Sequence, residues 1–169
     1  MPRWLSARLI LALIFAGCAG LLGFALYLQH ALDLEPCPMC ILQRYGFAAA
    51  GVLAGLGALH GPGPVGQRIY AALVGVAALA GGGVAARHTW LEHNPPRIAD
   101  CGPDLEFMVG SFPLAEALPM IFRGSGDCSK VAWRWLGLSI AEWSLVAFSG
   151  ILVTAVLIIL TARSTRRWF

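Results

Sequence analysis

The sequence predicts an all-α membrane protein, a bundle of four transmembrane helices with both termini on the cytoplasmic side and two loops on the opposite side. The first observation is composition: 58% of the 169 residues are hydrophobic and only 12% are charged, which is too apolar for a soluble domain of this size. The second is a set of four apolar runs of about membrane-spanning length. The third is the chain length, which suits one integral-membrane domain over residues 1–169 rather than two domains.

Four segments are predicted to cross the membrane, and they are Leu9 to Leu28, Ile41 to Leu59, Ile69 to Ala86 and Trp143 to Ala162. The first and last each have about 20 residues without a charge, and at ~1.5 Å per residue they cross a ~30 Å hydrocarbon core. The third is slightly shorter and also uncharged. The second is apolar except for Gln43 and Arg44 near its start.

A cleaved signal peptide is the rival interpretation of residues 1–28. Two arginines, Arg3 and Arg8, precede the apolar run, and Phe15 to Cys18 reads FAGC, which is similar to a lipoprotein cleavage site. The run nevertheless continues to Leu28 and is long enough to span, which favours a transmembrane helix. Cys18 is then a small packing residue in the middle of that helix.

The arginines orient the four predicted spans. One end of the predicted bundle carries six arginines: Arg3, Arg8, Arg68, Arg163, Arg166 and Arg167. The positive-inside rule places that end on the cytoplasmic side. All nine acidic residues fall on the other side. Two outer loops are therefore predicted, at about residues 29–40 and 89–142.

The second outer loop is too apolar to lie in water unaided. We expect a short helix around Phe112 to Phe122 that lies on the membrane surface and buries these side chains in the interface. A docking patch for a partner protein is the alternative. Trp133, Trp135 and Trp143 suit the interface where the chain returns to the membrane.

Four of the five cysteines lie in or beside the outer loops: Cys37, Cys40, Cys101 and Cys128. Outer cysteines of a membrane protein favour disulfide chemistry over packing. A structural zinc site usually takes its ligands from two close pairs, whereas Cys101 and Cys128 lie far apart in the sequence. We therefore expect no metal site, and separate Cys37–Cys40 and Cys101–Cys128 disulfides fit better.

The stretch PCPMCILQR, Pro36 to Arg44, places a cysteine pair at the start of the second span. Pro38 suits the first position of a helix, so the helix is predicted to begin near Cys37 and to carry Cys40 and Arg44 on one stripe. Residues three apart on a helix have Cβ atoms roughly 5–6 Å apart, close to disulfide geometry. The helix N-terminus and the Arg44 charge would both stabilise a thiolate at Cys40, although Arg44 could also simply extend to the interface.

The loop cysteines allow two interpretations. A Cys101–Cys128 bridge is either a plain staple, the commoner use of a disulfide outside the cytosol, or an exchangeable bond. The glycines between the two cysteines predict a mobile loop. A bond in such a loop can be attacked by the thiolate of another protein and by Cys37 or Cys40.

Taken together, these segments closely resemble the bacterial disulfide bond formation protein B (DsbB) family of four-span inner-membrane thiol oxidases. The resemblance covers nearly the whole chain and rests on PCPMCILQR, on His88-Thr89, on Cys101, on SGDC at Ser125 to Cys128 and on LGLSIAEWSL from Leu136 to Leu145. The segment Ala141 to Trp143 differs from the proline-containing version expected there, which affects only the local turn.

The resemblance implies an electron path. A reduced periplasmic oxidase of the DsbA type would attack Cys101, with Cys128 as its loop partner, and the electrons would pass to Cys37 and Cys40 and then to a bound quinone, either ubiquinone or menaquinone. Cys40 would face the quinone. The protein would thus support disulfide bond formation in secreted proteins.

The resemblance also implies the surroundings of that path. Arg44 would support the quinone and the Cys40 thiolate, His88 would lie beside the quinone at the outer surface, and Gln43 is a further contact. The chain would be a multi-pass protein of the bacterial inner membrane whose active loops face the periplasm. Its partners would be the DsbA-type oxidase, the quinone pool and the lipid bilayer, and no nucleic acid.

Three alternatives remain open from the residues alone. One is a carrier or sensor that binds a soft metal through Cys37, Cys40 and a nearby histidine such as His30. Another is a purely structural bundle stapled by two disulfides. The third is a protein similar to the vitamin K epoxide reductase family, against which the Cys101 and Cys128 loop argues.

Overall fold

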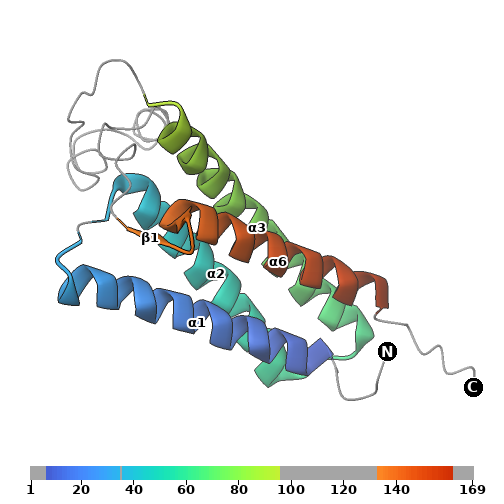
Figure 1. Ribbon diagram of the computed structural model, residues 1–169. Helices are drawn as coiled ribbons and strands as arrows, with labels where there is room; N and C mark the ends of the chain where they lie inside the picture. The colour runs from blue at the N-terminus through green and yellow to red at the C-terminus, as the bar shows by residue number, and fades with distance from the viewer. Residues whose placement is uncertain (1–6, 35, 96–132, 162–169) are drawn as a thin grey trace, which may run out of the picture.

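The computed structural model describes residues 7–34, 36–95 and 133–161. These residues form four long helices and one short hairpin: α1 (Ala7–Ala31), α2 (Pro38–His60), α3 (Pro64–His93), β1 (Arg134–Trp135), β2 (Leu138–Ser139) and α6 (Ile140–Thr161). All four helices are long and apolar enough to cross a membrane. The predicted four-helix membrane fold is confirmed, and Figure 1 shows that α1 begins at the end of the bundle where α6 finishes.

The helices are longer than the apolar runs that predicted them. Residues 29–31 continue α1 and residues 89–93 continue α3, although both segments were expected to lie in the outer loops. Each apolar run ends where polar side chains such as Gln29 and Glu92 begin, but the backbone hydrogen bonds of the helix continue past that point. The predicted surface helix around Phe112 to Phe122 lies outside the described residues.

The start of α2 has the geometry that its proline predicts. Pro38 is the first helical residue, and Cys37 is the N-cap, with φ −66° and ψ 161°. The Cys37 sulfur accepts a hydrogen bond from the Cys40 backbone N–H at 3.2 Å. The prediction that this helix begins near Cys37 is therefore confirmed. At the other end, Gly61 adopts a left-handed conformation with φ 55°, which a glycine takes without steric cost.

The four helices pack in a row. Helix α1 packs on α2, α2 on α3 and α3 on α6, whereas α1 and α6 barely touch. Small residues allow the close approach of α1 and α2: a Cβ atom added to Gly51 would lie 3.0 Å from Cys18, and one added to Gly55 would lie 3.0 Å from Phe15. Cys18 is a buried packing residue, as predicted.

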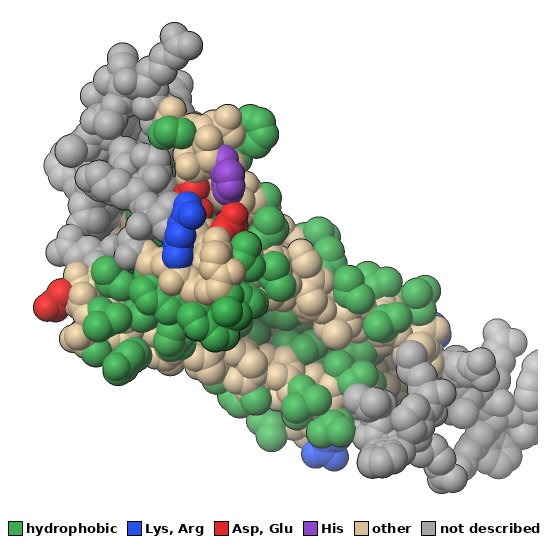
Figure 2. All heavy atoms as spheres, in the orientation of Figure 1, with side chains coloured by type: hydrophobic (Ala, Val, Ile, Leu, Met, Phe, Trp, Pro, Cys, Tyr) green, Lys and Arg blue, Asp and Glu red, His purple; other side chains and the backbone are tan. Residues whose placement is uncertain are grey.

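An aromatic pair fills the centre of the bundle. The rings of Phe47 on α2 and Phe148 on α6 stack with centroids 4.0 Å apart and planes 9° apart. Gly81 on α3 makes room for this pair, because an added Cβ atom would overlap the Phe148 ring. The outer surface of the helices is apolar as well, with exposed leucines and valines along its length, as lipid contact requires. Figure 2 shows these hydrophobic side chains over the face in view.

A two-residue turn and a capped helix start bring the chain back into the bundle. Arg134 pairs with Ser139 across the hairpin, and the turn residues Leu136 and Gly137 both have positive φ, 53° and 84°. Ser139 then caps α6: its hydroxyl accepts from the Glu142 N–H, and the Glu142 carboxylate accepts from the Ser139 N–H. This reciprocal capping starts α6 at Ile140, before the predicted Trp143.

Candidate active site

Two sulfur atoms lie together at the outer end of α2. Cys37 Sγ and Cys40 Sγ are 2.9 Å apart, and both residues are half-buried. A small rotation of either side chain brings them to the ~2.05 Å of a disulfide bond. The backbone N–H at the helix start is bonded to the Cys37 sulfur, because the N-cap side chain is the one that reaches this group. Sequence reasoning had placed the support of the helix start on Cys40.

Helix α3 brings His88 against the first of these cysteines. His88 Nε2 lies 3.8 Å from Cys37 Sγ, and His88 Nδ1 lies 3.0 Å from the Gln43 amide nitrogen. Both side chains are deeply buried, with His88 4% exposed and Gln43 3% exposed. His88 was expected to lie at the outer surface beside a bound ligand. In the structure it is buried against Cys37 and Gln43 and does not line the pocket described below.

Glu92 extends this buried polar group to α6, and sequence reasoning missed it. Its Oε1 lies 3.9 Å from His88 Nε2, and its side chain is only 6% exposed. The Ser139 hydroxyl donates to its other carboxylate oxygen at 2.6 Å. The four-residue spacing of His88 and Glu92 on one helix face was the available signal.

Arg44 ties α2 to α1. Its guanidinium donates to the Ala25 carbonyl at 3.1 Å and to the Gln29 side-chain oxygen. Within the described part of the chain, no carboxylate lies within ion-pair distance of Arg44. Its positive charge is therefore available to an anionic group in the adjacent pocket.

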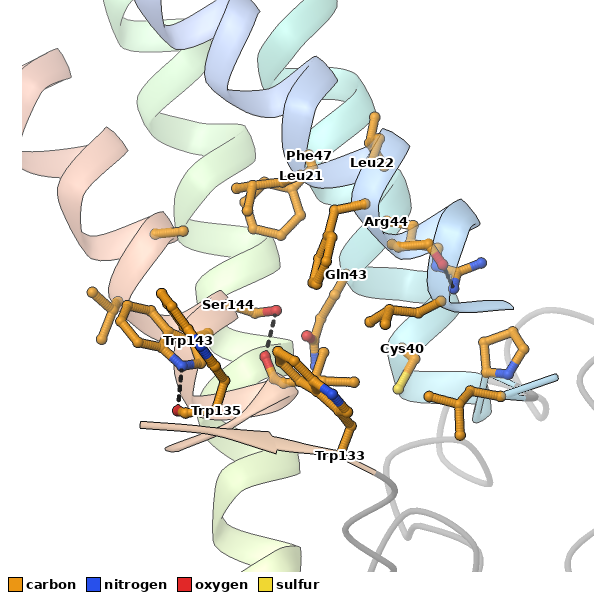
Figure 3. A pocket seen from close by; sticks show the side chains of 18 residues that line it. Leu21, Leu22, Cys40, Gln43, Arg44, Phe47, Trp133, Trp135, Trp143 and Ser144 are labelled. Carbon is orange, nitrogen blue, oxygen red and sulfur yellow. Dashed lines mark hydrogen bonds between the residues drawn. The ribbon is translucent and has the colours of Figure 1, made fainter. Parts of the chain in front are cut away.

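That pocket has a volume of about 770 Å³ and lies between α1, α2, α6 and the hairpin. It occupies the region where α1 and α6 fail to close against each other. Its walls are mainly leucine, phenylalanine and tryptophan, and its polar groups are those of Cys40, Gln43, Arg44 and Ser144. Figure 3 shows Cys40 and Arg44 on one side of the pocket and Trp135 and Trp143 on the other.

The hairpin holds the tryptophan side of the pocket in place. The Trp143 indole N–H donates to the Trp135 carbonyl at 3.1 Å, and the two rings lie 5.4 Å apart. Trp133 packs edge-on against Phe24 of α1. An apolar, aromatic-walled pocket with a few polar groups suits a lipophilic ring, and a cysteine that can cycle between thiol and disulfide lies in its wall.

The two cysteines thus face different surroundings. Cys40 lines the pocket, whereas Cys37 is not among the pocket residues and contacts His88. Cys101 and Cys128 lie outside the described residues. His30, the histidine considered for a metal site, is exposed, while the ligand atoms of Cys37, Cys40 and His88 all lie within 4.8 Å of one another.

Comparison with known proteins gives consistent matches over most of the chain. The family model described as "Disulfide bond formation protein DsbB" matches residues 7–158. The chain is 61% identical over 158 residues to Disulfide bond formation protein B of Aromatoleum aromaticum, which covers 94% of this chain and 95% of that protein. It is 57% identical over 148 residues to the protein of the same name from Azoarcus sp., with 88% of each chain covered. A third such protein, from Hahella chejuensis, is 48% identical over 151 residues, covering 89% of this chain and 92% of its own.

Proposed function

The chain belongs to the disulfide bond formation protein B (DsbB) family, and we propose on that premise that it reoxidises a periplasmic DsbA-type thiol oxidase and passes the electrons to a quinone. Family membership supports a function in disulfide bond formation, which is the chemistry of an oxidoreductase. Together with the four spanning helices, it makes the chain a multi-pass inner-membrane protein.

One observation carries the proposal, namely that the CxxC pair lies at the wall of an apolar pocket. Cys40 lines the pocket, and Cys37, whose sulfur lies 2.9 Å from that of Cys40, contacts His88 and is not among the pocket residues. A pair arranged in this way can exchange with another thiol through one sulfur and present the other sulfur to a bound oxidant.

The pocket residues fit a quinone. Leu21, Phe47 and Trp143 provide apolar contact for a ring and the start of an isoprenoid tail, and Gln43 and Arg44 provide hydrogen-bond donors for ring oxygens. A quinone bound there would supply a two-electron, two-proton sink for the dithiol. The weak contact between α1 and α6 leaves a lateral path by which a lipid-soluble molecule reaches the pocket without crossing water.

The proposed thiol steps follow from the cysteine chemistry. A thiolate of the partner attacks Cys101, which forms a mixed disulfide and releases Cys128 as a thiolate. The second thiolate of the partner then attacks the mixed disulfide and releases the Cys101 thiolate, so that the partner leaves with an intramolecular disulfide and Cys101 and Cys128 remain reduced. Attack of the Cys128 or Cys101 thiolate on the Cys37–Cys40 disulfide moves the two electrons to that pair. Reoxidation of Cys37 and Cys40 releases two electrons and two protons.

The neighbouring side chains assist these steps in distinct ways. The Arg44 charge, without a carboxylate partner among the described residues, stabilises a thiolate at Cys40 or a negative oxygen in the pocket. His88 Nε2, 3.8 Å from Cys37 Sγ, is placed to exchange a proton with that sulfur. Gln43 holds the imidazole ring through Nδ1.

We also propose that both termini lie in the cytoplasm and that the cysteine end of the bundle faces the periplasm. Arg8 and Arg68 lie in the helix turns at the end away from Cys37, where α1 begins and α3 begins. The positive-inside rule assigns that end to the cytoplasm. Access to a periplasmic oxidase requires the opposite end to face outward.

The test couples the two half-reactions. The purified chain in detergent is mixed with a reduced DsbA-type oxidase and a soluble ubiquinone analogue, and quinone loss and partner thiols are followed together. We expect equal losses that disappear in Cys40→Ser and Cys101→Ser and persist in Cys18→Ala, the matched buried cysteine of α1. Thiol oxidation without quinone loss would refute the proposal.

A further inference from the structure

We propose that reduced Cys37 and Cys40, together with His88, form a binding site for a thiophilic divalent cation such as Zn²⁺, and that metal binding and disulfide formation at this pair exclude each other. The ligand atoms of the three residues all lie within 4.8 Å of one another. The third ligand comes from α3, 51 residues along the chain from Cys37, which is why the cysteine spacing alone predicted no metal site.

The distances are close to those of a metal centre. In a tetrahedral site with zinc–sulfur bonds of about 2.3 Å and a zinc–nitrogen bond of about 2.0–2.1 Å, two sulfurs lie about 3.8 Å apart and each lies about 3.6 Å from the nitrogen. Cys37 Sγ and His88 Nε2 are already 3.8 Å apart. The two sulfurs, at 2.9 Å, need to separate by about 1 Å, and Cys40 borders the pocket, which leaves space for that movement.

The histidine is held in the orientation that a ligand needs. Gln43 contacts Nδ1 at 3.0 Å, which leaves Nε2 directed toward Cys37. A metal-bound imidazole carries its proton on the other nitrogen and donates it to an oxygen. The Gln43 amide can present its oxygen to Nδ1 by rotating in place, since its two ends have nearly the same shape. Because the side chains of His88 and Gln43 are both more than nine-tenths buried, the direction of the His88 ring is fixed before any cation binds.

Charge balance favours a divalent cation at this depth. Two thiolates neutralise the two positive charges, so the half-buried complex carries no net charge and avoids the cost of burying one. Binding releases the two thiol protons. Sulfur and imidazole ligands select zinc-like metals over Mg²⁺ or Ca²⁺. Glu92, whose other carboxylate oxygen lies 3.9 Å from His88 Nε2, accepts a hydrogen bond from Ser139.

The functional consequence is a block that acts on one redox state. A cation that holds the two sulfurs about 3.8 Å apart prevents the S–S bond from forming, and formation of that bond removes two of the three ligands. The metal therefore binds only the dithiol form. This inference goes beyond the proposed electron path and does not depend on quinone or on the partner oxidase.

The test measures binding rather than activity. The full chain carrying Cys101→Ser and Cys128→Ser, which removes the loop thiols, is reduced in detergent and titrated with Co²⁺, whose absorption bands report tetrahedral thiolate coordination. We expect a single Co²⁺ per chain, displaced by Zn²⁺, and no binding after oxidation of the Cys37–Cys40 pair. His88→Ala should weaken binding at least about tenfold, whereas His93→Gln, an exposed histidine of the same helix, should leave it unchanged.

Two results would overturn the proposal. One is equal Co²⁺ affinity in the parent and in a folded His88→Ala variant, which would exclude the histidine as a ligand. The other needs no variant at all: Co²⁺ that remains bound to the parent after the pair is oxidised would show that the metal lies elsewhere. The parent measurement therefore decides the question even if the His88→Ala variant fails to fold.

Discussion

Cys37 and Cys40 are only three residues apart and their sulfur atoms lie 2.9 Å from each other, yet the two cysteines have different neighbours. Cys37 caps the helix and contacts the buried His88, while Cys40 borders the pocket together with Arg44. The chemistry proposed for each cysteine follows from this difference: the sulfur beside His88 exchanges with a loop thiol, and the sulfur at the pocket wall meets the oxidant.

Arg44 provides the residue-scale prediction. Replacing it with methionine removes the positive charge and the donors beside Cys40, and hydrogen bonds to charged groups contribute about 1.5–3 kcal/mol. We expect Arg44→Met to lower kcat/KM for the soluble ubiquinone analogue by about tenfold to a hundredfold, as measured by steady-state quinone reduction with reduced partner in excess.

Two further variants separate charge from positioning. Arg44→Lys keeps the charge but loses the planar fork of the guanidinium. Its decrease in kcat/KM should therefore be smaller than that of Arg44→Met. Gln29→Ala removes one anchor of the guanidinium on α1 and should have a still smaller effect. Unchanged kinetics in Arg44→Met would exclude the proposed role.

The contact between α3 and α6 depends on a glycine. Gly81 lies against the Phe148 ring, which in turn stacks on Phe47 of α2. This contact therefore links α2, α3 and α6. It lies beside the pocket, since Phe47 also lines the pocket wall.

The element-scale prediction concerns Gly81→Ala. The added methyl group overlaps the Phe148 ring, and overpacking of this kind costs about 1–3 kcal/mol. We expect a lower thermal unfolding midpoint in detergent, partly restored by adding Phe148→Leu, as a double-mutant cycle would show. Gly83→Ala on the same helix meets nothing within 4 Å and should be neutral or stabilising. A similar loss in both variants would point to a general effect on α3 instead.

For the molecule as a whole, the arrangement of four helices in a row leaves a pocket where the first and last helices do not close. In the proposed function the pocket serves the oxidant, while the buried histidine contacts Cys37, which does not line the pocket. The proposal therefore predicts that thiol exchange and oxidant binding use different neighbours of the cysteine pair, and that a change inside the pocket should leave thiol exchange intact.

Filling the pocket tests this separation. Ala147 lines it from α6, and Ala147→Phe should lower quinone reduction strongly while the single-turnover reduction of the chain by its partner stays near the parent rate. Val153→Phe, on the exposed side of the same helix, is the size-matched control. The separation is wrong if Ala147→Phe slows both half-reactions equally.

Much of this architecture can be predicted from the sequence because its signals are local. Hydropathy locates the spans, Pro38 locates the start of α2, and the Ser139 to Glu142 spacing is a readable capping signal that corrects the start of α6. The hairpin turn is harder to predict, because Leu136 is not a residue type that favours positive φ.

Long-range neighbours are what the sequence leaves open. His88 and Cys37 are 51 residues apart, and neither periodicity nor spacing says that the histidine lies behind the cysteine rather than in the pocket. Glu92 meets Ser139 across 47 residues for the same reason: the packing of α3 against α6 decides the contact. The burial and the neighbours of these polar residues could therefore be learned only from the folded structure.

The open side between α1 and α6 gives the bilayer a structural part in the site. In a membrane, whatever the protein leaves unclosed is filled by acyl chains, so an oxidant that binds in the pocket exchanges one hydrocarbon for another and releases little water. Affinity then reflects competition with the surrounding amphiphile rather than desolvation. Detergents with different tails should consequently yield different apparent quinone affinities for the same folded chain.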